Sequence, residues 1–205
     1  GAPFEPLIAI VNVNPQEAER LADRGLTAHP IPNESLRALR RAYYALVTSV
    51  DRRVGRLMRA LVEAGLAEDT IVLFTADHGD MLAEKNMVQK RSFYEYSARV
   101  PLLLRYPDGS RAGLQCPQPA SLVDIVPTIL DLAGVPAEGR RPLDGGSLLP
   151  CLVGGETERV VFSESHTNGV YAVCIMARQG SYKYVYIHGE RGQLFDLAAD
   201  PGEWH

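Results

Sequence analysis

The sequence has 205 residues, of which 46% are hydrophobic and 22% are charged, and its net charge is -4 at neutral pH. This composition is that of a globular protein that can bury a sizeable core. A slightly acidic chain has no basic footprint for nucleic acid or an anionic membrane, and no apolar run approaches the roughly 20 residues that a membrane-spanning helix needs. We therefore expect neither nucleic-acid nor membrane partners.

The N-terminal part predicts a loop followed by a long helix. Residues 1–35 are rich in proline and asparagine and lack a clear period apart from 7-LIAIV-11. From Leu36 to Leu61, apolar residues recur at steps of three and four, which predicts a helix with one buried stripe. Its other faces carry several arginines, which we interpret as a solvated surface rather than an anion-binding patch. Gly65 fits the position just past the helix end.

Two apolar runs then predict buried strands. The run 71-IVLFT-75 is apolar on both faces, as a strand in a parallel sheet covered by helices would be, and 100-VPLLLRY-106 is a second such run. Between Ser121 and Gly134 another helix fits, capped by Ser121 or Asp124. Short β-like runs follow at 160–165, 170–176, 182–187 and 193–197. They predict a small antiparallel sheet.

These elements together predict an α/β fold. Residues 1–150 are expected to form a partial core sheet flanked by helices, with residues 1–35 largely loop. Residues 151–205 are expected to form a small antiparallel subdomain that is truncated at its C-terminal end. Three widely spaced cysteines, Cys116, Cys151 and Cys174, contain no CxxC pair, so we interpret them as reduced thiols rather than a disulfide or zinc framework.

The strongest chemical signal follows the 71–75 strand. Asp77, His78 and Gly79 stand where that strand would end, and in open α/β sheets ligands bind beyond the carboxyl ends of strands. Aspartate supplies a hard oxygen and histidine a nitrogen, so the two neighbours could reach one divalent cation, with Gly79 letting the chain turn away. The alternative is that Asp77 caps the next segment and His78 bonds locally, since two ligands do not complete a metal site.

Four ordered blocks of the chain resemble the sulfatase family of the alkaline phosphatase superfamily. The blocks are residues 43–66, 69–107, 121–135 and 193–203. Block 69–107 is similar to the metal-binding and substrate-anchoring segment of the family, and its Asp-His-Gly-Asp-Met version is similar to choline sulfatases and phosphonate monoester hydrolases. The resemblance implies an alkaline-phosphatase-like fold for the part of the chain from about residue 40 onward.

The resemblance also implies roles for three residues. Asp77 and His78 would be two ligands of the active-site divalent cation, most often Ca²⁺ in sulfatases and Mn²⁺ or Mg²⁺ in some relatives. Lys90, thirteen positions after Asp77, matches the family lysine that binds the sulfate or phosphonate oxygens. An ammonium group there offsets charge that develops on the transferred group, whereas the alternative is an ordinary surface lysine. Glu84 resembles a family glutamate, but Lys85 follows it where the family usually has His or Arg, which leaves the local substrate contacts open.

Two further residues resemble family features in part. In 116-CPQPA-120, the prolines have the wrong register for the Cys/Ser-x-Pro-x-Arg motif from which sulfatases make formylglycine, and the run follows the Asp-His-Gly segment instead of preceding it. Cys116 is therefore not a candidate nucleophile. His29 resembles a family histidine beside the substrate and is kept as an additional site candidate, with a loop histidine as the default.

The family keeps its nucleophile and its other metal carboxylates in the N-terminal half of the enzyme, and nothing before Asp77 matches them. We therefore expect the C-terminal portion of a metal-dependent sulfatase that acts on a small sulfate or phosphonate ester, with the formylglycine in an N-terminal half outside this chain. The alternatives are a phosphonate or phosphate ester hydrolase of the same superfamily and a non-catalytic binding relative.

The chain by itself is expected to be inactive, because it carries two metal ligands and one anion anchor but no nucleophile. Exposed strand edges also predict self-association of the isolated chain. Reduced thiols favour the cytoplasm, while the exported members of the family leave a periplasmic or secreted location open.

Overall fold

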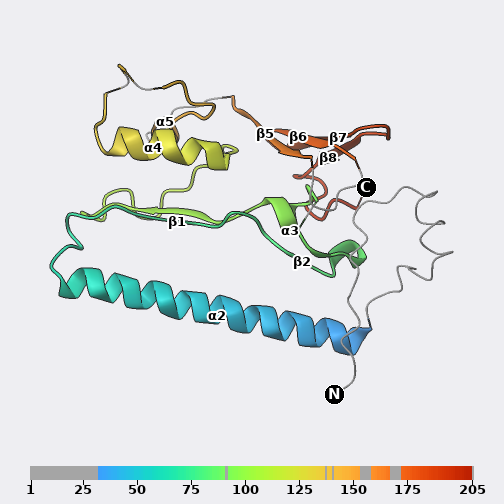
Figure 1. The fold of residues 1–205 in the computed structure, drawn as a ribbon, viewed down its shortest axis with the longest axis horizontal. Helices are drawn as coiled ribbons and strands as arrows, with labels where there is room; N and C mark the ends of the chain where they lie inside the picture. The colour runs from blue at the N-terminus through green and yellow to red at the C-terminus, as the bar shows by residue number, and fades with distance from the viewer. Residues whose placement is uncertain are drawn as a thin grey trace. The chain divides into compact units, whose positions relative to one another are not determined.

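The computed structural model describes residues 32–90, 92–136, 138–139, 141–152, 158–166 and 172–204. Two compact units make up the chain, residues 1–110 and 111–205 (Figure 1). None of the helices in the described ranges is long and apolar enough to cross a membrane. The candidate His29 lies outside the described residues, and the predicted boundary between residues 150 and 151 stays a prediction.

The first unit begins with a long helix, α2, which spans Asn33–Glu63 and confirms the predicted helix. It ends in a Schellman motif, in which Gly65 takes the left-handed conformation at φ 70°. The Gly65 N–H donates to Val62 O at 3.0 Å, and the Leu66 N–H donates to Leu61 O at 2.9 Å. These two bonds satisfy carbonyls that the helix end would leave open, and glycine adopts this conformation without strain.

The buried stripe predicted for α2 is wrong for this chain. No residue of the helix is fully buried, and stripe members Leu46, Val50 and Leu57 are 64%, 47% and 59% exposed. The physical reason is that the described residues supply too little apolar surface to cover the stripe.

Strands β1 (Val72–Thr75) and β4 (Leu102–Arg105) confirm the two predicted strands, but their predicted burial is wrong, because β1 is only half-buried and Leu103 of β4 is 61% exposed. They pair in antiparallel fashion, with Thr75 opposite Leu102. The parallel arrangement predicted for the 71–75 strand is therefore wrong for the pairing seen, since within the described ranges β1 pairs with β4 alone. An apolar run on both faces indicates burial on both faces, but it does not fix the direction of the neighbouring strand.

The connection between β1 and β4 forms a small folded segment. It contains the strands β2 (Met81–Leu82) and β3 (Val88–Gln89), which form a hairpin, the 3-10 turn η1 (Glu84–Asn86) between them, and the helix α3 (Glu95–Ala98). Met81 and Met87 are buried, and Tyr94 packs against them. This small apolar cluster anchors the hairpin to the chain that follows it.

The second unit contains the turn η2 (Leu122–Asp124), the helices α4 (Ile125–Leu132) and α5 (Leu149–Leu152), and a four-stranded sheet. The η2 and α4 pair confirms the helix predicted between Ser121 and Gly134. The Ser121 N–H donates to the Asp124 carboxylate at 2.8 Å, so both predicted capping residues take part in the helix start. Gly134, at φ 67°, ends α4 as Gly65 ends α2.

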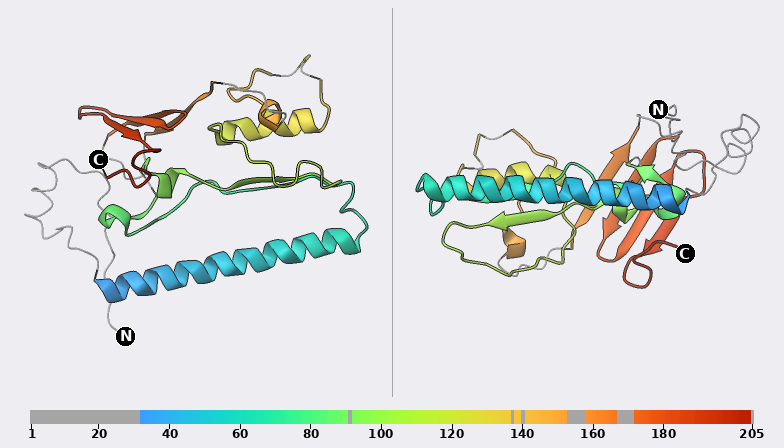
Figure 2. Two further views of the ribbon diagram at one scale, coloured as in Figure 1. Left: turned by 180° about the vertical axis from the view of Figure 1, so that it is seen from behind. Right: turned by 90° about the horizontal axis from the view of Figure 1, so that it is seen from below.

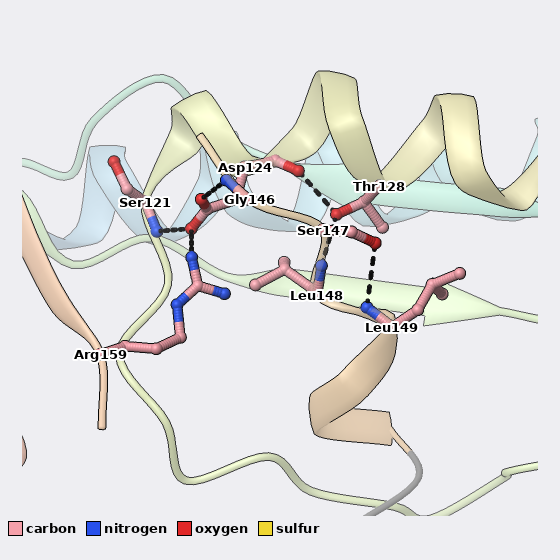
Figure 3. A network of polar contacts seen from close by, with 8 residues as sticks. All are labelled: Ser121, Asp124, Thr128, Gly146, Ser147, Leu148, Leu149 and Arg159. Atoms are coloured by element: carbon pink, nitrogen blue, oxygen red, sulfur yellow. Dashed lines mark hydrogen bonds and ion pairs between the residues drawn. The ribbon is translucent and has the colours of Figure 1, made fainter. Parts of the chain in front are cut away.

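A buried polar network holds the 144–149 loop against the start of α4 (Figure 3). Asp124 is 2% exposed and accepts hydrogen bonds from the Ser121 and Gly146 N–H groups, the latter at 2.9 Å. Its Oδ2 also lies 2.7 Å from Arg159 Nη2. The Thr128 hydroxyl donates to Asp124 O at 2.6 Å and accepts the Leu148 N–H at 2.9 Å. Every polar atom that this network buries therefore has a partner.

The sheet of the second unit is antiparallel in the order β5-β6-β7-β8 (Figure 2). Its strands are β5 (Val160–Ser165), β6 (Cys174–Gln179), β7 (Tyr182–Ile187) and β8 (Gln193–Asp196). The predicted small antiparallel sheet is confirmed, although β6 begins at Cys174 where the sequence predicted a start at residue 170. Burial alternates along β7, so that Lys183, Val185 and Ile187 face inward and the three tyrosines are exposed.

Lys183 is an inward-facing cation in that sheet. Its side chain is 0% exposed and forms an ion pair with Glu203, whose side chain is also 0% exposed. Glu203 takes a left-handed backbone conformation at φ 56°, which is uncommon for a non-glycine residue. The ion pair therefore docks residues 200–204 onto the inner face of the sheet.

Candidate active site

The site segment begins where β1 ends, as the sequence predicted. Asp77 follows β1 by two residues, and its side chain is 85% exposed. Its carboxylate accepts its own backbone N–H and that of His78, the latter at 3.0 Å, and these bonds lower the pKa of Asp77. Asp77 is consequently an ionised oxygen donor that faces solvent.

One ring nitrogen of His78 bonds to the backbone, and the other faces the side chains of Asp77 and Lys90. Its Nδ1 lies 2.8 Å from Gly79 O, and a carbonyl can only accept, so Nδ1 carries the proton. Nε2 then presents a lone pair, and it lies 3.4 Å from Asp77 Oδ2. A backbone carbonyl that fixes the tautomer of a histidine in this way is typical of metal-ligating imidazoles.

Lys90 lies beside the same nitrogen. Its Nζ is 2.7 Å from His78 Nε2, and because an ammonium group can only donate, this contact requires the same histidine tautomer. Lys90 itself is exposed. The structure thus brings Asp77, His78 and Lys90 together at one surface point, while their roles remain predictions.

Gly79 has a packing role that differs from the one predicted. Its φ is not among the left-handed values, so it does not provide an unusual turn. Instead, a Cβ on Gly79 would lie 2.2 Å from Tyr96 O, and the Gly79 N–H donates to Ser97 O at 2.8 Å. The backbone of α3 therefore approaches too closely for any side chain at position 79. This contact fixes the position of the backbone next to His78.

The donor set of the segment fits a divalent cation. Two ligand atoms at about 2.3–2.5 Å from one cation lie roughly 3.3–3.5 Å apart when the angle at the cation is near 90°. The Asp77 Oδ2 to His78 Nε2 separation of 3.4 Å matches that spacing. Within the described ranges, no three His, Cys, Asp or Glu side chains gather as a complete metal site. Asp77 and His78 would therefore supply only part of the ligand set of such a cation.

Two residues of α2 also contact this segment, although the sequence did not predict it. Arg40 was assigned to a solvated face, but it binds Leu82 O and Glu84. The pKa of Tyr43 is raised by burial and by the Asp80 carboxylate, which accepts a hydrogen bond from the Tyr43 phenol. Arg40 and Tyr43 are three residues apart and so share one helix face, which is the signal that could have identified them.

Lys85, which follows Glu84, places its ammonium group over an aromatic ring. Its Nζ lies 4.8 Å from the centre of the Tyr94 ring. Lys85 also has a left-handed backbone at φ 51°, as do Ala83 at 77° and Gln89 at 70°. Three such non-glycine residues within the hairpin are unusual, and conformations of this kind cluster at functional sites.

Family models match both parts of the chain. The model described as Sulfatase matches residues 11–135, and the model described as N-sulphoglucosamine sulphohydrolase, C-terminal, matches residues 83–205. The chain is 42% identical over 174 residues to choline-sulfatase from Rhizobium meliloti (strain 1021), which covers 84% of this chain and 34% of that protein. It is 37% identical over 208 residues to arylsulfatase K from Rattus norvegicus, which covers 96% and 36%.

A solved structure is similar in fold as well as sequence. The phosphonate monoester hydrolase of Agrobacterium radiobacter matches with a TM-score of 0.72 at 35% identity, over 84% of this chain and 37% of that one. The chain thus spans about a third of the length of the curated relatives that it matches.

Proposed function

Because the chain belongs to the sulfatase family, we propose that the protein containing it is a metal-dependent hydrolase of sulfate esters. The observation that supports this most directly is the convergence of Asp77, His78 and Lys90, with Lys90 Nζ 2.7 Å from His78 Nε2 and Asp77 Oδ2 3.4 Å from it. A carboxylate, an imidazole lone pair and an ammonium at one surface point form part of a site for a cation and an anionic ester.

In this proposal, Asp77 and His78 hold a divalent cation, with Ca²⁺ expected first and Mn²⁺ or Mg²⁺ as alternatives. A cation bound there supplies Lewis-acid polarisation of the ester oxygens. The Gly79 carbonyl keeps Nδ1 of His78 protonated, so that Nε2 remains available as a ligand. Ligation through Nε2 would require Lys90 to release this nitrogen, which its ammonium now contacts at 2.7 Å.

Lys90 is proposed to bind the oxygens of the transferred sulfuryl group. Its stem is flexible, so its ammonium can leave His78 Nε2 and donate to an anionic oxygen nearby. A positive charge at this point stabilises negative charge that grows on the oxygens as the ester bond breaks. Lys90 is thus the proposed catalytic residue of this chain.

The nucleophile is proposed to be a formylglycine in a part of the protein outside this chain. The described residues contribute the cation ligands and the anion anchor, so the isolated chain is proposed to be inactive. His29 remains a candidate beside the substrate, outside the described residues.

Hydrolysis of phosphonate or phosphate esters is a second candidate for the same site. It is favoured by the similarity in sequence and fold to a phosphonate monoester hydrolase. Sulfate monoesters carry one negative charge and phosphonate monoesters carry one as well, so Lys90 and the cation would serve either. A non-catalytic binding relative is the remaining alternative.

The test uses the full-length protein and aryl sulfate and aryl phosphonate monoesters as substrates. Lys90→Ala is expected to lower kcat/KM about 10²–10³-fold, the range for removing one donor that stabilises developing charge. Asp77→Asn is expected to weaken cation binding measured by calorimetry, whereas Asp69→Asn, an exposed aspartate ahead of β1, should change neither property. Removal of cations by a chelator should abolish turnover, and the cation that restores it identifies the metal.

The relative rates on the two esters decide between the first two candidates. A protein that carries a formylglycine motif yet hydrolyses neither ester would contradict both and support a binding role. If Lys90→Ala retains full activity, Lys90 is not the anion anchor.

A further inference from the structure

Arg40 connects helix α2 to the hairpin that precedes Lys90. Its Nε donates to Leu82 O at 3.1 Å, and its Nη2 lies 3.1 Å from Glu84 Oε1. The other carboxylate oxygen of Glu84 accepts the Leu82 N–H. One ion pair therefore holds both backbone polar groups of Leu82, one through each partner.

The hairpin needs such support because its own ladder is short. Only two residue pairs form it, Met81 with Gln89 and Leu82 with Val88. Short two-stranded pairs are marginal by themselves, and their register is weakly specified. Gln89, which directly precedes Lys90, also has a left-handed backbone at φ 70°, and a non-glycine residue keeps that conformation only where its surroundings hold it.

We propose that the Arg40–Glu84 ion pair is a positioning clamp that fixes the register of the β2–β3 hairpin and thereby places the Lys90 ammonium beside His78. The inference rests on the proposed function for the role of Lys90, but not for the clamp itself. Arg40 and Glu84 act through Leu82 and are positioning residues. A shift of one residue in the hairpin register would displace Gln89, which ends β3, and with it the Lys90 side chain that follows.

An ordinary surface ion pair would not have this effect, since exposed pairs contribute little. Two features distinguish this one. Glu84 is only 18% exposed, against 42% for Arg40, so its carboxylate is largely removed from solvent. The guanidinium also donates to two different acceptors in the fixed geometry of its fork, which a mobile surface pair does not do.

Hydrogen exchange in the full-length protein tests the clamp without reference to activity. The variants are Arg40→Met, Glu84→Ala and the double variant, with Arg52→Met as the matched control, because Arg52 is exposed on the same helix. Amides of residues 81–90 should exchange about tenfold faster in both single variants, because opening the ion pair releases local structure. The double variant should show no further increase, and amides of β1 should keep the exchange rates of the unmodified protein.

Kinetics on the sulfate ester supply a second test. Arg40→Met and Glu84→Ala should each lower kcat/KM about 10–100-fold, as displacement of a catalytic group does. Cation affinity measured by calorimetry should change less than about threefold, because Asp77 and His78 precede the hairpin. Arg40→Lys keeps the charge but loses the fork, so it should show an intermediate loss, and it serves where Arg40→Met does not fold.

Three results would overturn the proposal. The first is that amides of residues 81–90 exchange at the same rate in Arg40→Met and Arg52→Met. The second is that the faster exchange extends equally to the amides of β1. The third is that the effects of the two single variants add in the double variant. If the protein hydrolyses no sulfate ester, the proposed function fails, and the exchange experiment still decides whether the clamp exists.

Discussion

The charged residues of the site segment and those of the second unit lie in opposite environments. The side chains of Asp77 and His78 are 85% and 32% exposed. The Asp77 carboxylate contacts the backbone N–H and the ring of the adjacent His78. Asp124 and Lys183, in contrast, are 2% and 0% exposed, and both have ionic partners that are themselves largely buried. The family resemblance alone does not separate these two kinds of charge, but burial and partnering do.

The difference indicates which charges are available for chemistry. A buried charge with a complete set of partners is held in one arrangement, and binding an incoming ligand would require breaking it. An exposed carboxylate and an imidazole whose lone pair accepts only from the exposed Lys90 ammonium can bind a cation at little cost to the fold. Substitutions in the second unit should therefore change stability, and substitutions of Asp77 or Lys90 should change activity.

The largest expected effect on stability is that of Lys183→Met. The change leaves the Glu203 carboxylate buried without its cation, which typically costs about 3–5 kcal/mol. Denaturant unfolding of the full-length protein, followed by a probe in the second unit, measures the loss. Lys183→Met combined with Glu203→Leu should recover most of it, because no uncompensated charge then remains. Equal stability of Lys183→Met and the unmodified protein would show that this buried charge does not stabilise the fold.

A smaller loss is expected for Asp124→Asn. Asparagine keeps the size of the side chain, but its NH₂ group would face one of the donors that Asp124 now accepts, and Arg159 loses its anion. Hydrogen bonds to charged groups contribute about 1.5–3 kcal/mol, so a loss of about 2–3 kcal/mol is expected. Asp144→Asn is the matched control, since Asp144 is exposed in the loop that Asp124 holds, and it should stay within about 0.5 kcal/mol. The two variants should differ clearly in their unfolding midpoints.

Much of the fold followed from local patterns in the sequence. The α2 helix, the β1 and β4 strands and the C-terminal sheet were predicted from hydrophobic periods, and Gly65 from its place after the last periodic residue. The direction of the β1 and β4 pair was not predictable in this way, because the apolar run of 71–75 suits either direction. In 182-YKYVYI-187, alternation gave two faces but did not show that the lysine face is the buried one, since the partner Glu203 lies twenty positions later.

The candidate site was predictable in its parts and not in its support. Asp77, His78 and Lys90 were selected from their place after a strand and from four ordered blocks, and the structure brings them together. Arg40 was not selected, because a helical period shows which residues share a face but not what lies opposite that face. Long-range contacts of this kind, 42 and 44 residues apart in the chain, are visible only in three dimensions.

Gly79→Ala tests a residue that lies beside the candidate site ligands and is also required by the packing of the fold. Its new Cβ would meet Tyr96 O at 2.2 Å, so the backbone must move, at a cost of about 1–3 kcal/mol. Gly55→Ala is the control, since the nearest atom to its Cβ is Arg59 Nη1 at 3.7 Å and alanine favours the helix by about 1 kcal/mol. The midpoint of thermal unfolding and the cation affinity should both fall in Gly79→Ala. Neither should fall in Gly55→Ala. Loss of stability with unchanged cation affinity would show that the contact with α3 does not place His78.

The smallest effect is a difference in alkylation rate between an accessible and a buried cysteine, which is measured in the unmodified protein. Cys116 is exposed and Cys174 is buried. Burial raises the pKa of both thiols, and the neighbouring Cys151 thiol raises that of Cys116 further. Since the thiolate is the reactive form, alkylation of Cys116 by iodoacetamide should rise about tenfold per pH unit below its pKa.

Peptide mass spectrometry of the folded full-length protein measures this reaction between pH 7 and pH 9.5, with Cys116→Ser to assign the signal. Cys174 should stay unmodified over the same range until denaturant is added, because its sulfur lies on the inner face of the sheet beside Ile187. Alkylation of Cys174 in the folded protein at the rate of Cys116 would mean that this face opens readily. The buried charges on it, Lys183 and Glu203, would then no longer differ from the site residues in their access to solvent.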